Sequence, residues 1–269
     1  SKLRVLSHNP PIQSNAGLDI HEMPQKGRRY VVTVDVARGT VNDYSAFIVT
    51  DASQIPYKVV AKYKNNEIKP LLFPQVIHKI AKSYNNAEIL VEVNDIGGQV
   101  ADTLQFDLEY DNLIMVNQRG RSGQIAGTGF SGKKSQLGLR TTKATKKIGC
   151  SNLKAMIELD KYIIQDFDVI AELSTYVLKG KEKYEAEEGS SDDLVTCLVM
   201  FAWLSNQMYF KELTDQDIRA RLVDEQQNQM DQDMAPFGFV DDGIESPEGE
   251  TYKDPHGTSW SPVKYKRGW

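Results

Sequence analysis

The sequence predicts an α/β fold in which a mixed central sheet is flanked by helices. Three β-branched runs follow one another near the start of the chain with short turns between them, as in an antiparallel meander. Apolar strand-like runs then alternate with amphipathic helical segments, an order typical of parallel strands joined by a covering helix. A chain of 269 residues can bury one substantial core, so we expect one domain with appended segments.

The meander is predicted over residues 30–63. Its strands are Tyr30–Val36, Tyr44–Thr50 and Tyr57–Tyr63. The first turn contains Gly39 and also carries an acid, Asp43.

A helix is predicted next, over Pro70–Tyr84, with Pro74 in its first turn. Ala87–Val93 follows as a buried strand, Gly97–Leu108 as an amphipathic helix and Leu113–Val116 as a short strand. Because a helix connects these two strands, we expect them to be parallel neighbours.

The second half of the chain is predicted to be mainly helical. Residues 119–140 contain six glycines, which indicates a basic hairpin or loop insertion. The other predicted elements are the helix Thr142–Leu159, the strand Tyr162–Ile164, the helix Val169–Leu178, the charged hairpin Lys179–Tyr184 and a strongly apolar helix with Asp192 and Asp193 in its first turn. This apolar helix is the last of the core, and Ser190 or Ser191 is expected to cap it.

Composition divides the chain into three parts. Residues 1–28 contain several Pro and Gly with little periodicity, so we expect a linker or N-terminal arm and a fold that begins near Arg29. Residues 29–210 form the predicted domain. Residues 211–269 are acidic and are expected to form a helix followed by a tail that folds on a partner.

The net charge of −5 hides a strongly uneven distribution. No acidic residue occurs from Asn112 to Ile157, where nine cations gather. Scattered lysines are usually a solvated surface, but the absence of any acid favours contact with duplex DNA phosphates. The cations proposed to bind DNA are Arg119, Arg121, Lys133, Lys134, Arg140, Lys143, Lys146 and Lys147, and the ninth is Lys154.

Acidic residues stand at the ends of three apolar elements. Asp35 ends YVVTVDVARG, Glu92 lies in AEILVEVND, and Asp192 and Asp193 open SSDDLVTCLVMFAWL. Taken alone, Asp35 is explained as a turn cap and the Asp pair as routine first-turn acids. Glu92 is harder to explain that way, because an unpaired Glu is uncommon in a run that is apolar on both faces. Together they predict a shared Mg²⁺ site, because buried acids are costly unless they are paired or hold a metal and carboxylates are the ligands Mg²⁺ prefers. Metal-assisted phosphodiester hydrolysis is the leading interpretation.

Other chemistries find little support. The segment GTGFSGKK at 127–134 resembles a phosphate-binding loop, but Lys134 stands where a Ser or Thr hydroxyl would bind Mg²⁺. Cys150, Cys197 and the four histidines show no metal-ligand spacing. We expect no membrane span and a soluble, intracellular protein.

From about Arg29 to Met208 the chain resembles the nuclease domain of the terminase large subunit of tailed bacteriophages, most closely the T-even type. The segments that carry the resemblance are VVTVDVARGTVNDYSAF, ILVEVNDIGGQVADTL, TKATKKIGCSNLKAMIELDKYII and GSSDDLVTCLVMFAWLS. It implies a ribonuclease H-like fold and a Mg²⁺-dependent endonuclease that cuts concatemeric viral DNA, with Mn²⁺ as a possible substitute. It also implies Asp35, Glu92 and Asp193 as catalytic residues and metal ligands, with Asp192 and Asp43 as further candidate ligands. The family often has His before the Asp pair, where this chain has Ser191.

The resemblance also implies partners. These are double-stranded DNA, the capsid portal, the small terminase subunit and an ATPase domain of the same full-length protein, with action in the host cytoplasm at the viral prohead. Two alternatives stay open: a DNA-gripping domain of the packaging motor, and another ribonuclease H-like enzyme such as a junction resolvase or transposase.

Overall fold

The computed structural model describes residues 8–38, 43–117, 124–125, 135–179, 183–208, 210–211, 252–253 and 259–260. Residues 1–221 form one compact unit, and residues 222–269 form a second. The described part of the second unit is a short antiparallel pair, β13 (Tyr252–Lys253) and β14 (Ser259–Trp260).

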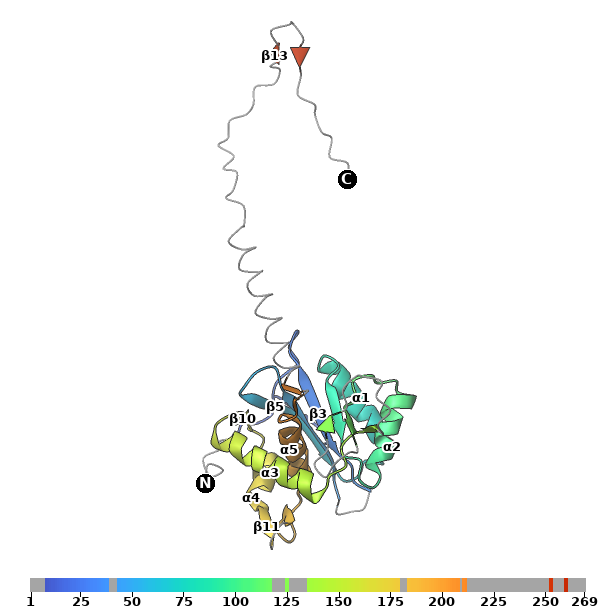
Figure 1. Cartoon of the computed structure of the whole chain (residues 1–269), viewed down its shortest axis with the longest axis vertical. Coiled ribbons are helices and arrows are strands. Elements are labelled where there is room, and N and C mark those ends of the chain that lie inside the picture. The colour runs from blue at the N-terminus through green and yellow to red at the C-terminus, as the bar shows by residue number, and fades with distance from the viewer. Residues whose placement is uncertain are drawn as a thin grey trace. The chain divides into compact units, whose positions relative to one another are not determined.

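A mixed sheet forms the centre of the first unit (Figure 1). In the described residues its order is β1-β2-β5-β4-β3-β6, with β10 beside β5. The meander β3-β4-β5 is antiparallel as predicted, whereas β6 is parallel to β3 and β10 is parallel to β5. The strands are β1 (Gln13–Asn15), β2 (Leu18–Ile20), β3 (Tyr30–Asp35), β4 (Ser45–Asp51), β5 (Tyr57–Asn65), β6 (Glu88–Val91) and β10 (Tyr162–Ile163).

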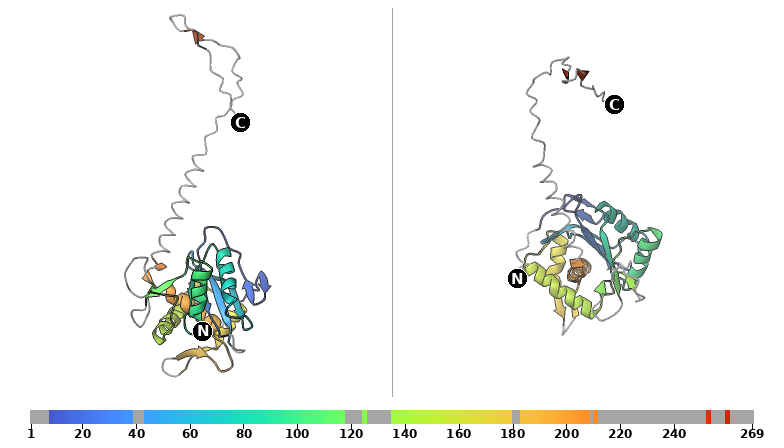
Figure 2. Two further views of the ribbon diagram at one scale, coloured as in Figure 1. Left: turned by 90° about the vertical axis from the view of Figure 1, so that its right-hand side faces the viewer. Right: turned by 45° about the horizontal axis from the view of Figure 1, so that its top comes forward.

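Helices cover both faces of this sheet (Figure 2). Alternate strand residues point to opposite faces, so Val32 and Val34 of β3 join the core beneath one helix layer and Val31 joins the core beneath the other. The first layer is α1 (Phe73–Ser83) and α2 (Gly97–Asp102), the latter continued by a π-helical turn η2 (Thr103–Asp107). The second layer is α3 (Lys143–Glu158), α4 (Phe167–Thr175) and α5 (Asp193–Leu204).

Helix α5 is the central element of the second layer. Every residue from Leu194 to Leu204 is buried, which explains why this helix is apolar all round rather than amphipathic. It packs closely against α3, where a Cβ on Gly149 would lie 2.5 Å from the carbonyl oxygen of Val199. No helix within the described ranges is both long and apolar enough to cross a membrane.

The prediction that residues 1–28 are only a linker was wrong for the β1-β2 hairpin. Strand β2 pairs with the edge of β5, and the N–H of Lys64 donates to the carbonyl of Gly17 at 3.0 Å. The side chain of His21 also reaches Asp166 at 2.9 Å. Each strand has only three residues and none is fully buried, although Leu18 and Ile20 pack against the core, so the apolar alternation is too short to predict a strand.

The prediction for Leu113–Val116 was only partly right. Leu113 forms a single parallel bridge to Ile89, but the strand that follows, β7 (Met115–Asn117), belongs to another sheet. Its partners there are β8 (Gln124–Ile125) and β9 (Ser135–Leu137). The predicted helix ending at Leu178 stops at Thr175, because Tyr176 already begins the hairpin β11 (Tyr176–Lys179) and β12 (Lys183–Ala186).

Candidate active site

Asp35 and Glu92 lie side by side at the carboxyl ends of two parallel strands. Asp35 is the last residue of β3, and Glu92 directly follows β6 and donates its N–H to the carbonyl of Val34 at 2.8 Å. Thr33 lies two residues before Asp35, and Leu90 lies two residues before Glu92. These two residues pair with each other, and Leu90 belongs to the core beneath α5. Because residues two apart on a strand face the same side of the sheet, Asp35 and Glu92 also face the α5 layer.

Helix α5 brings the third acid to the same place. Its first residue is Asp193. Burial raises the pKa of Asp35 well above its ordinary value, and so do the charge of Glu92, a hydrogen bond with Glu92 and the charges of Asp193 and Asp192. Burial first, and then the charge of Glu172, raise the pKa of Asp193 to about 7. The structure thus brings together the three acids that the sequence singles out.

The donor chemistry of this cluster fits a hard divalent cation. Asp35, Glu92 and Asp193 present carboxylate oxygens from two strand ends and a helix start, and each repels its neighbours when ionised. In the described part of the chain no three acidic, His or Cys side chains already converge as closely as metal ligands do.

Asp192 and Asp193 have different surroundings. Asp192 is the residue before the helix, and its Oδ2 lies 3.5 Å from Nζ of Lys146. The charges of both residues raise the pKa of Asp35, and the charge of Asp193 has the larger effect. The arrangement therefore supports Asp193 as the metal ligand and Asp192 as an ion-pair partner.

Asp43 lies just before β4, three residues from Ala46, which pairs with Asp35. Its side chain is exposed. It stands at the same end of the sheet as the cluster, and its supporting role remains a prediction.

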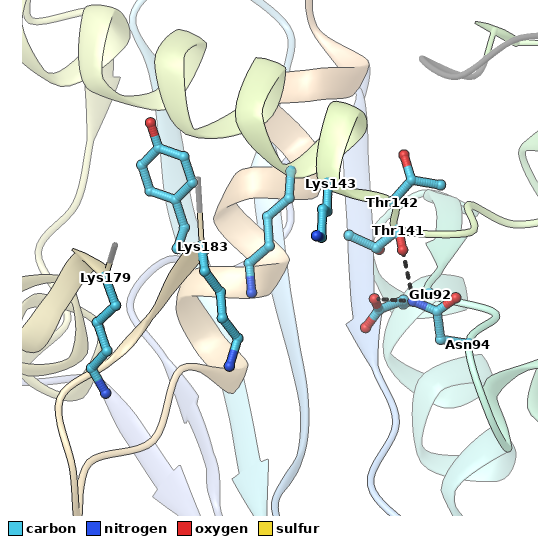
Figure 3. A pocket seen from close by; sticks show the side chains of 9 residues that line it. Glu92, Asn94, Thr141, Thr142, Lys143, Lys179 and Lys183 are labelled. Carbon is cyan, nitrogen blue, oxygen red and sulfur yellow. Dashed lines mark hydrogen bonds between the residues drawn. The ribbon is translucent and has the colours of Figure 1, made fainter. Parts of the chain in front are cut away.

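A lysine-lined pocket of about 710 Å³ opens beside Glu92 (Figure 3). The amide of Asn94 donates to Glu92 Oε1 at 2.9 Å and to the carbonyl of Thr141 at 3.1 Å, which fixes one wall. The side chains that line the pocket are Glu92, Asn94, Thr141, Thr142, Lys143, Lys146, Lys179, Lys183 and Tyr184.

Two of the predicted DNA-binding cations line this pocket. Lys143 and Lys146 lie in the first turn of α3, which begins within one residue of its predicted start. Thr142 is the N-cap of this helix and forms a capping box with Thr145. The positive end of the helix adds to their charge, a combination that attracts anions. Arg140 and Lys147 lie outside the pocket lining.

The other predicted cations, Arg119, Arg121, Lys133 and Lys134, fall outside the described residues, as does the segment 127–134. Sequence reasoning had not assigned Lys179, Lys183 and Tyr184 to the site. The signal available for them was the charged hairpin itself, whose position beside Glu92 only the fold reveals.

The expected Ser190 or Ser191 cap of α5 is not formed. The carboxylate of Glu172, from α4, accepts hydrogen bonds from the N–H groups of Leu194 at 2.9 Å and Val195 at 3.2 Å instead. Ser191 donates its hydroxyl to that same carboxylate at 3.1 Å. A cap supplied by another helix leaves no mark in the local sequence.

Residues 32–203 match the family model described as the terminase RNaseH-like domain. The chain belongs to this family. The ribonuclease H-like fold of the terminase family, with its mixed sheet between helices, is therefore confirmed.

Solved terminase structures share the fold. The large terminase nuclease of thermophilic phage G20c, solved with bound magnesium, is 16% identical and superposes with a TM-score of 0.56, covering 76% of this chain and 95% of that one. The nuclease domain of the large terminase of Thermus phage P74-26 is 17% identical, with a TM-score of 0.56 and coverages of 77% and 94%. The G20c protein has also been solved with bound cobalt, at 17% identity, a TM-score of 0.55 and coverages of 76% and 95%.

Proposed function

We propose that this terminase domain is a Mg²⁺-dependent endonuclease that cleaves concatemeric double-stranded viral DNA during genome packaging. The observation that carries the proposal is that Asp35, Glu92 and Asp193 come together and that Glu92 also lines a pocket with four lysines. An acid cluster alone suits a cation, and a basic groove alone suits a polyanion. An acid cluster beside a basic groove suits a phosphodiester that is held against a metal centre.

Each part of the site has a definite task in this proposal. Asp35, Glu92 and Asp193 hold the cation, which supplies an activated water and stabilises the leaving 3′ oxygen when bound. Lys143, Lys146 and the hairpin lysines hold the DNA backbone without reading sequence. Mn²⁺ fits the same oxygen donors. The magnesium-bound structure of the G20c relative supports this choice of cation.

Membership of the terminase family supports the packaging role in this proposal. The partners we propose are double-stranded DNA, an ATPase domain of the same full-length protein, the capsid portal and the small terminase subunit. The place of action is the host cytoplasm, at the prohead.

The decisive experiment is cleavage of supercoiled and linear plasmid by wild type, Asp193→Asn and Asp192→Asn protein with Mg²⁺, Mn²⁺ or EDTA. We expect metal-dependent degradation by wild type, a loss of at least about 100-fold in Asp193→Asn and much smaller effects in Asp192→Asn. Full cleavage after Asp35→Ala or Glu92→Ala would refute the proposed ligand set.

A DNA-gripping role in the packaging motor is the second candidate, favoured by the lysine-lined pocket. The same plasmids serve to test it, because well-folded wild type that binds duplex but never cuts it would favour gripping over cleavage. Preference for branched junctions over plain duplex would instead indicate a resolvase.

A further inference from the structure

The first turn of α5 is held by groups from two other elements. An α-helix begins with N–H groups that have no partner inside the helix. Asp192, the residue before α5, supplies no side-chain cap. Glu172 Oε2 accepts from the N–H groups of Leu194 and Val195, the two residues directly after Asp193. The main chain of a proposed metal ligand is thus fixed by a carboxylate from α4.

The other oxygen of Glu172 is also engaged. Nζ of Lys64, from β5, lies 2.5 Å from Glu172 Oε1 and 2.6 Å from Ser191 Oγ. Glu172 is only 6% exposed, so a carboxylate there needs this compensation. Glu172 makes one ion pair and accepts three hydrogen bonds, all of which hold the start of α5 in place. Its oxygens are therefore not poised to bind a cation.

Lys64 also connects the cap of α5, formed by Glu172, to the strand that carries Asp35. On the sheet, Lys64 pairs with Ala46, and Ala46 pairs with Asp35. Directly opposed residues of neighbouring strands share a face, so Lys64 and Asp35 belong to one row beneath α5. The thiol of Cys197, one turn into α5, donates to the carbonyl of Ala46 at 3.7 Å. Helix α5 is therefore held against this row of residues at two points, at its start through Lys64 and one turn later through Cys197.

We propose that Glu172 and Lys64 are positioning residues that set Asp193 opposite Asp35, so that the site is preorganised for its cation. The inference rests on the proposed function and extends it to residues that touch neither metal nor DNA. Preorganised ligands bind tightly because little ordering is left to binding, so loosening the first turn of α5 lowers the affinity for the cation.

The test measures Mn²⁺ binding to the full chain by electron paramagnetic resonance, together with amide exchange of Leu194 and Val195 in metal-free buffer. Glu172→Gln and Lys64→Met are expected to raise the Kd for Mn²⁺ at least about tenfold and to accelerate exchange at those two amides. Lys64→Arg, which keeps the ion pair, is expected to stay within about threefold of wild type. Lys58→Met, on the same strand but paired with Glu22, is the control and should match wild type.

The Lys64→Met variant separates positioning from simple charge. Removing a cation beside Asp193 would tighten Mn²⁺ binding if only electrostatics mattered, whereas positioning predicts weaker binding. Tighter or unchanged binding in Lys64→Met therefore overturns the inference, even if Glu172→Gln fails to fold. If wild type binds Mn²⁺ and cuts DNA, and Glu172→Gln and Lys64→Met bind Mn²⁺ as tightly as wild type, only the positioning role is overturned. A wild type that does neither overturns the proposed function and this inference with it.

Discussion

Gly97 packs directly against the main-chain carbonyl of Glu92. A Cβ at position 97 would lie 1.8 Å from that oxygen, a distance that no side chain tolerates. Gly97 opens α2. The glycine therefore determines how closely α2 approaches the strand end that carries a proposed metal ligand.

We expect Gly97→Ala to reduce cleavage at least about tenfold, because the backbone that carries Glu92 must shift. The neighbouring Gly98→Ala is the matched control, since nothing lies within 4 Å of a Cβ placed there. Plasmid cleavage and thermal unfolding of both variants check this. Equal activity in the two would show that Glu92 does not depend on this glycine.

Asp193→Asn should stabilise the protein when metal is absent. Because the folded state raises the pKa of Asp193 to about 7, folding favours its protonated form. The contribution of this group to the free energy of unfolding is therefore greatest near pH 4 and falls as pH rises toward about 7.

At pH 8 in EDTA we expect Asp193→Asn to be more stable than wild type by about 1–3 kcal/mol, with the difference shrinking toward pH 4. Urea unfolding at the two pH values measures it. Asp111→Asn, at an exposed position, serves as the control. A variant less stable than wild type at pH 8 would contradict the prediction.

The hairpin lysines should contribute to DNA affinity without affecting fold stability. Replacing Lys179 and Lys183 with Gln is expected to weaken duplex binding and to lower the salt dependence of log K by about one for each lysine that neutralises a phosphate. Lys154→Gln, on the exposed side of α3, should leave both quantities unchanged. Fluorescence anisotropy at several salt concentrations distinguishes these outcomes.

Gly149→Ala should destabilise the domain by roughly 2 kcal/mol or more, because the added methyl group meets the Val199 carbonyl at 2.5 Å and forces α3 away from α5. The midpoint of urea unfolding reports this. Ala144→Gly, at a partly exposed position in the first turn of α3, should cost only about 1 kcal/mol. If the Gly149→Ala variant were destabilised no more than that, the close packing of the two helices would not limit stability.

Most of the sheet could be predicted because its strands are buried and continuous in apolar character. The antiparallel meander, the strand before Glu92 and the long helix after Thr142 could all be predicted from the pattern of apolar residues. The hairpin at residues 13–20 could not be found this way, because its strands have only three residues each and only Leu18 and Ile20 of them pack against the core.

The three acids could be singled out because each interrupts an apolar pattern at the end of an element. Glu172 and Lys64 could not, since each lies in an ordinary amphipathic segment and gains its role only from a distant partner. The preference for Asp193 over Asp192 as the proposed ligand likewise rests on the fold, because α5 begins at Asp193 and Asp192 lies just before it.

The late position of α5 in the chain has a consequence for synthesis. Asp35 leaves the ribosome about 160 residues before Asp193 and Glu92 about 100 residues before it, and a domain folds as a unit. A growing chain therefore holds an incomplete set of ligands until the helix that fills the second layer has been made. Under the proposed function, a fragment that ends before Asp193 lacks one metal ligand and does not cut DNA.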